Sequence, residues 1–280
     1  MALTAESTSR FIDLPSGTMH YNEAGEGHPL ILIHGSGAGA SGWSNFNPNI
    51  EALAENFRVF AIDVIGWGQS DAVKDNVFNG PVQVIEFMDA LGLDKAALVG
   101  NSMGGIIAIA AAARYKDRVS HLITMGPGAF MGVPSMFGAG GPTEGIKILL
   151  KGYQNPTTET MRELVSVMAF DPAMASDEIA QGRAAAVQAH PEHIPNALKG
   201  FQTGALVACG ATPEEVTGIT APSLLIHGRD DRVVHFENTL RLVAAIPDSR
   251  ALLINRCGHW AQLEHADEFN RLVTEFILSN

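Results

Sequence analysis

The chain has 280 residues, of which 46% are hydrophobic and 17% are charged. This composition is typical of a globular protein with a sizeable core, and it excludes an intrinsically disordered chain. The net charge of −12 argues against nucleic-acid binding, because no basic face is available to neutralise phosphates. Residues 1–10 lack the apolar stretch of a signal peptide, and no apolar run reaches about 18 residues. Together with only two cysteines, these features predict a cytoplasmic protein without disulfides or membrane contact.

Short apolar segments alternate with helical patterns along most of the chain. Residues 11–23 predict an antiparallel hairpin at a sheet edge, with its turn at residues 15–17. The segments predicted as buried strands are residues 30–33, 57–62, 96–99, 122–125, 223–226 and 251–254. The helical patterns between them are residues 82–91, 103–114, 238–245 and 267–278. This order predicts an α/β fold with a mostly parallel central sheet and helices on both faces.

The alternation stops between residues 127 and 218. Amphipathic helical patterns occur in this stretch, at residues 160–170 and 177–189. We therefore expect a helical lid at residues 127–218, inserted into a core domain of residues 1–126 and 219–280. Such a lid would cover the carboxyl ends of the parallel strands, where open α/β sheets bind ligands.

A G-x-S-x-G pentapeptide is the strongest motif of the chain, and it contains Ser102 between Gly100 and Gly104. An apolar strand precedes the motif and an apolar helix follows it. This context predicts a tight strand-to-helix turn that raises the serine hydroxyl above the sheet, with a helix N-terminus behind it. The alternative is a glycine-rich turn with an incidental serine, which the strand-turn-helix context disfavours.

A nucleophilic serine requires a base and an acid that orients the base. In α/β-hydrolases the acid and the base follow the serine in that chain order. Asp230 and Asp231 follow the strand at 223–226, and a G-x-x-D-x-x-V pattern favours Asp231 as the acid. His259, directly after the strand at 251–254, is the candidate base, whereas His265 lies further into the last helix and reads as a packing or surface histidine.

The glycine-rich loop of residues 34–42 follows the first parallel strand. Its glycines allow backbone N–H groups to approach a ligand, and no G-K-[ST] follows that would indicate a phosphate loop. We expect the oxyanion hole to use N–H groups of Ser36 or Gly37 together with that of Met103. His34 is expected to orient this loop rather than to carry protons.

At this point the sequence resembles the meta-cleavage product hydrolases, the carbon–carbon bond hydrolases of the α/β-hydrolase superfamily. The resemblance covers nearly the whole chain, and it is carried by residues 34–37, 42–46, 100–105, 125–128, 143–147, 181–183 and 257–262. It implies an α/β-hydrolase fold and a role in the bacterial degradation of aromatic compounds. Ala38 and Ala184 depart from residues that relatives often carry, which leaves the side group of the substrate open.

The resemblance also implies a substrate and a set of residues that bind it. The substrate class is an anionic 2-hydroxy-6-oxo-hexa-2,4-dienoate with an alkyl or aryl group at C6, cleaved between C5 and C6. The resemblance assigns Asn45, Asn101, Arg183 and Trp260 to substrate binding, and Ser102, Asp231 and His259 to catalysis. We expect no cofactor and no metal, and a homo-oligomer of two or more chains. His190 and His193 are expected on a solvated surface.

Three other functions remain to be weighed. A carboxylesterase would use the same three catalytic residues, but it would not need Asn45, Arg183 and Trp260. A haloalkane dehalogenase or epoxide hydrolase would need a carboxylate at position 102, where this chain has serine. A ligand receptor on the same fold would not need Ser102, Asp231 and His259, so their presence favours an enzyme.

Overall fold

A single mixed sheet runs through the computed structural model, which describes residues 3–74, 78–128 and 141–280. Eight strands form it in the order β1-β2-β4-β3-β5-β6-β7-β8. They are β1 (Ser9–Leu14), β2 (Gly17–Ala24), β3 (His28–Ile33), β4 (Phe57–Ile62), β5 (Ala96–Asn101), β6 (Val119–Met125), β7 (Ser223–Gly228) and β8 (Ser249–Ile254). Pairs β1·β2 and β2·β4 are antiparallel and the other five are parallel. The predicted edge hairpin and all six predicted parallel strands are confirmed.

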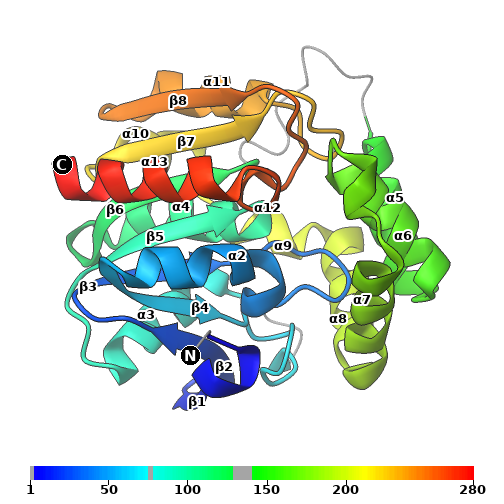
Figure 1. Cartoon of the computed structure of the whole chain (residues 1–280). Coiled ribbons are helices and arrows are strands. Elements are labelled where there is room, and N and C mark those ends of the chain that lie inside the picture. Colours follow the sequence, from blue (N-terminus) through cyan, green and yellow to red (C-terminus); the bar gives the residue numbers. More distant parts are fainter. Residues whose placement is uncertain (1–2, 75–77, 129–140) are drawn as a thin grey trace.

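Helices cover both faces of this sheet (Figure 1). On one face lie α2 (Gly42–Ala54), α12 (Ala261–Glu264) and α13 (Ala266–Ser279). On the other lie α3 (Gly80–Ala90), α4 (Met103–Arg114), α9 (Ala205–Ala208), α10 (Pro213–Thr217) and α11 (Glu237–Ala245). Helix α1 (Ala5–Thr8) precedes the sheet, and the 3-10 turn η2 (Lys116–Arg118) leads into β6.

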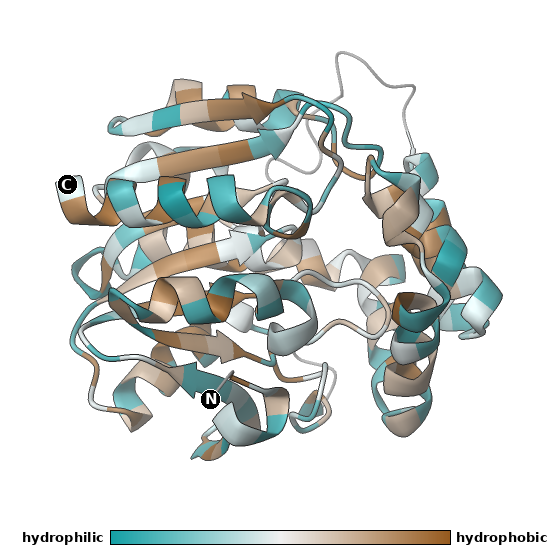
Figure 2. Cartoon of the chain, viewed as in Figure 1, coloured by the Kyte–Doolittle hydropathy of each residue, from teal (hydrophilic) through white to brown (hydrophobic). Residues whose placement is uncertain are grey.

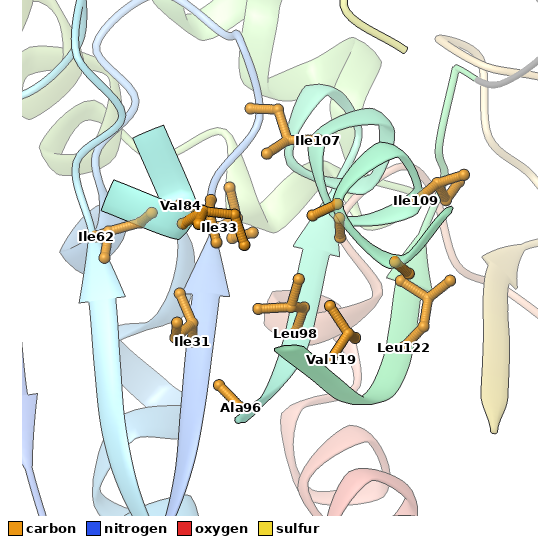
Figure 3. Packing of buried hydrophobic residues seen from close by; sticks show 14 of the residues in the cluster. Ile31, Ile33, Ile62, Val84, Ala96, Leu98, Ile107, Ile109, Val119 and Leu122 are labelled. Carbon is orange, nitrogen blue, oxygen red and sulfur yellow. The ribbon is translucent and has the colours of Figure 1, made fainter. Parts of the chain in front are cut away.

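The apolar core is split by the sheet into two layers. Figure 3 shows one of them, in which Ile33 and Leu98 of the strands pack against Val84 of α3 and Ile107 of α4. The other layer joins alternate strand residues to α2 and α13. Because both faces are buried, the central strands are hydrophobic along their length (Figure 2).

The inserted segment, residues 127–218, leaves the sheet after β6 and returns before β7. Of its helices, α5 (Glu144–Gln154), α6 (Thr158–Met168), α7 (Asp177–Ala189) and α8 (His193–Thr203) lie at the end of the sheet to which the arrows of β5 and β7 point (Figure 1), and the 3-10 turn η3 (Pro172–Met174) joins α6 to α7. They share a third apolar cluster, which also contains Ala38, Val233 and Trp260. The division at 127 and 218 and the function of a lid stay predictions.

Helix α2 was missed by the sequence analysis. It contains Pro48 and three asparagines, which are weak helix formers. Ser41 compensates with a reciprocal capping box to Ser44, and the helix buries Phe46, Ile50 and Leu53. Burial of these side chains in the core therefore stabilises this helix, rather than the intrinsic helix preference of its residues. Among the described residues no helix is long and apolar enough to cross a membrane.

Candidate active site

Ser102 occupies the turn between β5 and α4. Its backbone angles are φ 55° and ψ −114°, a conformation that is strained for a residue with a side chain. The neighbouring glycines permit the turn, because a Cβ on Gly104 would lie 2.0 Å from the Ile33 carbonyl oxygen. The Ser102 N–H donates to the Met125 carbonyl at 2.8 Å. Helix α4 starts at the next residue, so its positive N-terminal end lies beside the serine.

His259 pairs with Asp231 and not with Asp230. The Nδ1 atom of His259 donates to Oδ2 of Asp231 at 2.7 Å, and both side chains are buried. The other carboxylate oxygen accepts the backbone N–H groups of Val233 at 2.7 Å and Val234 at 3.0 Å. Asp230 instead lies 3.5 Å from Arg229. The arrangement fixes the imidazole by Nδ1, as a base oriented by an acid requires.

A second histidine, His227, contacts the same carboxylate. Its Nε2 atom donates to Asp231 at 3.1 Å and to the Val234 carbonyl at 2.9 Å, so its Nδ1 accepts from the Thr239 hydroxyl at 2.7 Å. Burial alone would raise the pKa of Asp231, but the charge of His259 and the hydrogen bonds from both histidines outweigh it and lower the pKa. The sequence analysis did not find His227, because it lies inside strand β7 with no motif of its own.

Gly126 lies directly against the Asp231–His259 pair. It has φ 51°, and a Cβ there would lie 2.9 Å from Nδ1 of His259 and 3.1 Å from Oδ2 of Asp231. Only glycine combines this conformation with this clearance.

The glycine-rich loop runs directly beside the serine, since a Cβ on Gly35 would lie 3.2 Å from Cβ of Ser102. His34 accepts the Val64 N–H on Nε2 at 3.0 Å and therefore donates from Nδ1 to the Gly35 carbonyl at 2.7 Å. Burial lowers the pKa of His34, so it is a neutral anchor of the loop, as the sequence indicated. The N–H of Met103 belongs to the first turn of α4, where no intrahelical acceptor exists.

Asn45 and Asn101 form a buried amide pair. Nδ2 of Asn45 donates to Oδ1 of Asn101 at 3.0 Å, while Nδ2 of Asn101 donates to the carbonyls of His259 at 3.1 Å and Met125 at 3.3 Å. Asn101 thus ties the base to the strand that carries the nucleophile. Within the described chain Oδ1 of Asn45 has no partner, so it is free to accept from a ligand.

Arg183 of helix α7 is buried, with 5% of its surface exposed. Its Nη1 donates to the Ala38 carbonyl at 2.9 Å, and its guanidinium carbon lies 4.7 Å from the ring centre of Trp260. No carboxylate among the described residues pairs with it. Burial lowers its pKa to about 10, with Tyr153 opposing the shift, so the cation persists at neutral pH.

The serine, the candidate base and the predicted substrate-binding residues meet in one pocket. Its lining includes Gly35, Ser36, Gly37, Asn45, Asn101, Ser102, Arg183, His259 and Trp260. A larger cavity of about 240 Å³ is lined by the later part of the glycine-rich loop, from Gly39 to Ser41, and by Trp67, Tyr153 and His193. None of Ser102, Asp231 and His259 lines this larger cavity. We therefore place the chemistry in the smaller pocket.

Residues 30–272 match the alpha/beta hydrolase family. The chain is 43% identical to a 2-hydroxy-6-oxo-6-phenylhexa-2,4-dienoate hydrolase of Burkholderia cepacia, over 98% of each chain. It is 41% identical, over 98% of each chain, to a 2-hydroxy-6-oxononadienedioate/2-hydroxy-6-oxononatrienedioate hydrolase of Comamonas testosteroni. The chain belongs to the meta-cleavage product hydrolases of the alpha/beta hydrolase family.

The solved structures of other meta-cleavage product hydrolases agree with this fold. A mutant of the Pseudomonas fluorescens enzyme CumD superposes with a TM-score of 0.87 at 34% identity, over 96% of this chain and 97% of that one. The fold and the inserted segment are therefore shared along nearly the whole length.

One group of possible metal ligands lies outside the active-site pocket of this hydrolase. His190, Glu192 and His193 bring ligand atoms within 4.8 Å of one another, and both histidines line the larger cavity. The expectation of a solvated surface was wrong for His193, which is buried and donates from Nε2 to the Gly68 carbonyl at 3.3 Å. Packing of α8 against the loop at Gly68 causes this burial, and the local sequence does not reveal it.

A second Ser–His–Asp group was also missed. The Ser9 hydroxyl lies 3.0 Å from Nε2 of His20, whose Nδ1 donates to Oδ2 of Asp63 at 2.8 Å. The same carboxylate accepts the backbone N–H groups of Gly42 at 2.6 Å and Gln69 at 2.9 Å. Cys209 and Cys257 are free, and both are buried.

Proposed function

We propose that this chain hydrolyses the C5–C6 bond of 2-hydroxy-6-oxo-hexa-2,4-dienoates with an alkyl or aryl group at C6. The products are 2-hydroxypenta-2,4-dienoate and a carboxylic acid. The observation that carries the proposal is that Arg183 is buried in the same pocket as Ser102 and His259 and that no carboxylate of residues 3–74, 78–128 and 141–280 pairs with it. A buried cation without a counter-ion is costly, and a substrate carboxylate offsets that cost through charge-assisted hydrogen bonds.

The first step is ketonisation of the dienol. The C2 hydroxyl loses its proton, the π electrons shift, and C5 gains a proton, with His259 as the carrier. Arg183 binds the C1 carboxylate and Asn45 accepts from a substrate donor through its free Oδ1. Trp260 stacks on the guanidinium and keeps it in place.

The second step is addition to the C6 carbonyl. Either Ser102 Oγ or a water oxygen bonds to C6, and its proton passes to His259. The negative charge that develops on the C6 oxygen is stabilised by N–H groups of Ser36 or Gly37 and of Met103. The C5–C6 bond then breaks, and its electron pair moves into the conjugated ketone that C1–C5 form, which leaves as the dienol after protonation. If Ser102 attacked, water hydrolyses the resulting ester.

A substrate panel tests this proposal. Dienoates with methyl, isopropyl and phenyl groups at C6 lose their visible absorbance on cleavage, and p-nitrophenyl acetate serves as the ester control. We expect higher kcat/KM values for at least one dienoate than for the ester. Turnover of the ester without turnover of any dienoate would instead identify a carboxylesterase.

A further inference from the structure

The junction between α7 and α8 brings two histidines and a carboxylate together (Figure 1). His190 directly follows α7, and His193 is the first residue of α8, with Pro191 and Glu192 between them. The His193 N–H donates to the His190 carbonyl at 3.2 Å, so the connection is a tight turn. One ligand atom from each of His190, Glu192 and His193 lies within 4.8 Å of the other two. Three possible metal ligands therefore meet where the two helices join.

His193 is the fixed member of this group. Its side chain is buried, and its Nε2 donates to the carbonyl of Gly68, in the core, at 3.3 Å. A neutral imidazole with its proton on Nε2 carries its lone pair on Nδ1. Within residues 3–74, 78–128 and 141–280, Nδ1 of His193 has no hydrogen-bond partner. A buried acceptor without a partner is costly, and a backbone carbonyl on the opposite ring nitrogen is a common support of histidine metal ligands.

The other two side chains are exposed enough to adjust. The side chain of His190 is 34% exposed and that of Glu192 is 50% exposed, with Nδ1 of His190 3.2 Å from Oε1 of Glu192. The rings of His190 and His193 are nearly parallel, with their centres 5.6 Å apart. Ligand atoms of a tetrahedral Zn²⁺ site lie roughly 3.4 Å apart at bond lengths of about 2.1 Å. Closing the group onto an ion therefore requires an approach of at most roughly 1.4 Å between ligand atoms.

We propose that His190, Glu192 and His193 bind a divalent transition-metal ion such as Zn²⁺, with water completing the coordination. Two imidazoles and one carboxylate form a ligand set that Zn²⁺ accepts, whereas Mg²⁺ and Ca²⁺ take oxygen ligands. Asp63 lines the same cavity as the two histidines, and its negative charge favours a cation there.

The site is separate from the proposed hydrolysis. Both histidines line the larger cavity, which none of Ser102, Asp231 and His259 lines. A bound ion joins the end of α7 to the start of α8 and, through the hydrogen bond of His193 to Gly68, to the core. Its role is therefore to fix this part of the inserted segment on the core and not to act on the substrate.

Zinc binding by chelator-treated protein tests the proposal. In isothermal titration calorimetry we expect one equivalent of Zn²⁺ per wild-type chain, and Zn²⁺ should raise the melting temperature because the ion binds the folded state. His190→Ala should weaken binding by at least about tenfold, since even the loss of a supporting partner has an effect of that size. Glu192→Gln should weaken binding less, because an amide oxygen remains as an uncharged ligand. These two exposed positions carry the test, since replacing the buried His193 also disturbs packing.

His265→Ala is the matched control. His265 and Glu268 form another histidine–carboxylate pair, 4.0 Å apart, and no third ligand joins them in the described part of the chain. This variant should bind Zn²⁺ as the wild type does. His259→Ala should also bind it, because the ion is expected outside the active-site pocket. Co²⁺ in place of Zn²⁺ should give the visible absorbance of a low-coordinate site in wild type and lose it in His190→Ala.

Each outcome supports or overturns the proposal. No binding by the wild type, or binding that both His190→Ala and Glu192→Gln leave unchanged, would overturn it. Equal losses in His190→Ala and His265→Ala would show adventitious binding to surface histidines, which also overturns it. Binding that is lost in His259→Ala and kept in His190→Ala would place the ion in the active-site pocket instead. No dienoate enters these measurements, so their result is independent of the proposed function.

Discussion

The proposed catalytic group of Ser102, His259 and Asp231 has a counterpart near the antiparallel edge of the sheet, where Ser9, His20 and Asp63 are joined by hydrogen bonds. The Asp–His contacts are nearly equal, at 2.7 Å and 2.8 Å, and all four of these side chains are buried. The serines differ. Ser102 precedes the N-terminus of a 12-residue helix in a strained conformation, whereas Ser9 follows the C-terminus of a four-residue helix and pairs within β1·β2.

The difference lies in what surrounds the hydrogen-bonded residues. Ser102 shares its pocket with the buried cation of Arg183 and lies at the N-terminal end of α4, so we expect negative charge on a substrate to be stabilised there. Ser9 has a helix end of the opposite polarity beside it, which disfavours negative charge. Asp63 instead holds two backbone N–H groups of neighbouring loops. A Ser–His–Asp alignment alone therefore does not make a hydrolase site, and the following changes test this.

The largest effect is expected from replacing Ser102, with Ser9 as the comparison. Ser102→Ala should lower kcat by roughly 10³ or more, because the hydroxyl that shares the pocket with the base is lost. Adding His259→Ala should cost little more, since the residues act as one unit. Ser9→Ala should leave dienoate turnover unchanged. Steady-state kinetics on both variants measure these effects. A loss of kcat in Ser9→Ala as large as that in Ser102→Ala would show that the assignment of catalysis to the Ser102 group is wrong.

The next effect separates the two adjacent carboxylates. Asp231→Asn should reduce kcat by about 10³ to 10⁴, because the amide cannot hold the tautomer of His259 that a base requires. Asp230→Asn is the control, and a loss of less than tenfold is expected there. The same kinetic assay measures both variants. If Asp230→Asn is the more damaging change, Asp231 is not the catalytic acid.

A smaller effect is expected at Arg183. A charge-assisted hydrogen bond contributes about 1.5–3 kcal/mol, which corresponds to roughly 10-fold to 150-fold in kcat/KM. Arg183→Ala should show this loss on dienoates and little change on p-nitrophenyl acetate, which carries no carboxylate. Equal losses on both substrates would point to a disturbed inserted segment, and no loss on either would remove Arg183 from the site.

The smallest effect concerns pH. The base must be neutral, so kcat/KM should fall toward acid pH. The pKa of Asp231 is lowered, so the carboxylate stays ionised through this limb and its negative charge supports the role of His259 as proton acceptor. In Asp231→Asn this support is lost, and the acid limb of the residual activity should move to lower pH. His20→Gln should leave the acid limb of kcat/KM in place. An acid limb that moves in His20→Gln and not in Asp231→Asn would contradict the assignment of His259 as the base.

Much of the fold could be predicted from sequence because local patterns carry it. The parallel strands are continuous apolar runs, and the turn at Ser102 follows from its glycines. Asp231 could be favoured over Asp230 from spacing alone. The missed contacts join distant residues: Tyr153 and Ser36 are 117 positions apart, and Asn101 and His259 are 158 apart. Such pairs depend on how segments far apart in the sequence pack together, within the core domain or between it and the inserted segment, which no short pattern encodes. The oligomeric state and the roles of the predicted site residues stay predictions.

Gly126 has a consequence for protein engineering. It directly follows β6, at the predicted start of the inserted segment, and its missing side chain leaves room for the Asp231–His259 pair. The last residue before the predicted insertion thus also lies directly against the Asp231–His259 pair. A chimera that exchanges the inserted segment for that of a relative should place its N-terminal junction after Gly126. A junction that introduces any side chain there would displace the base, however well the new segment folds.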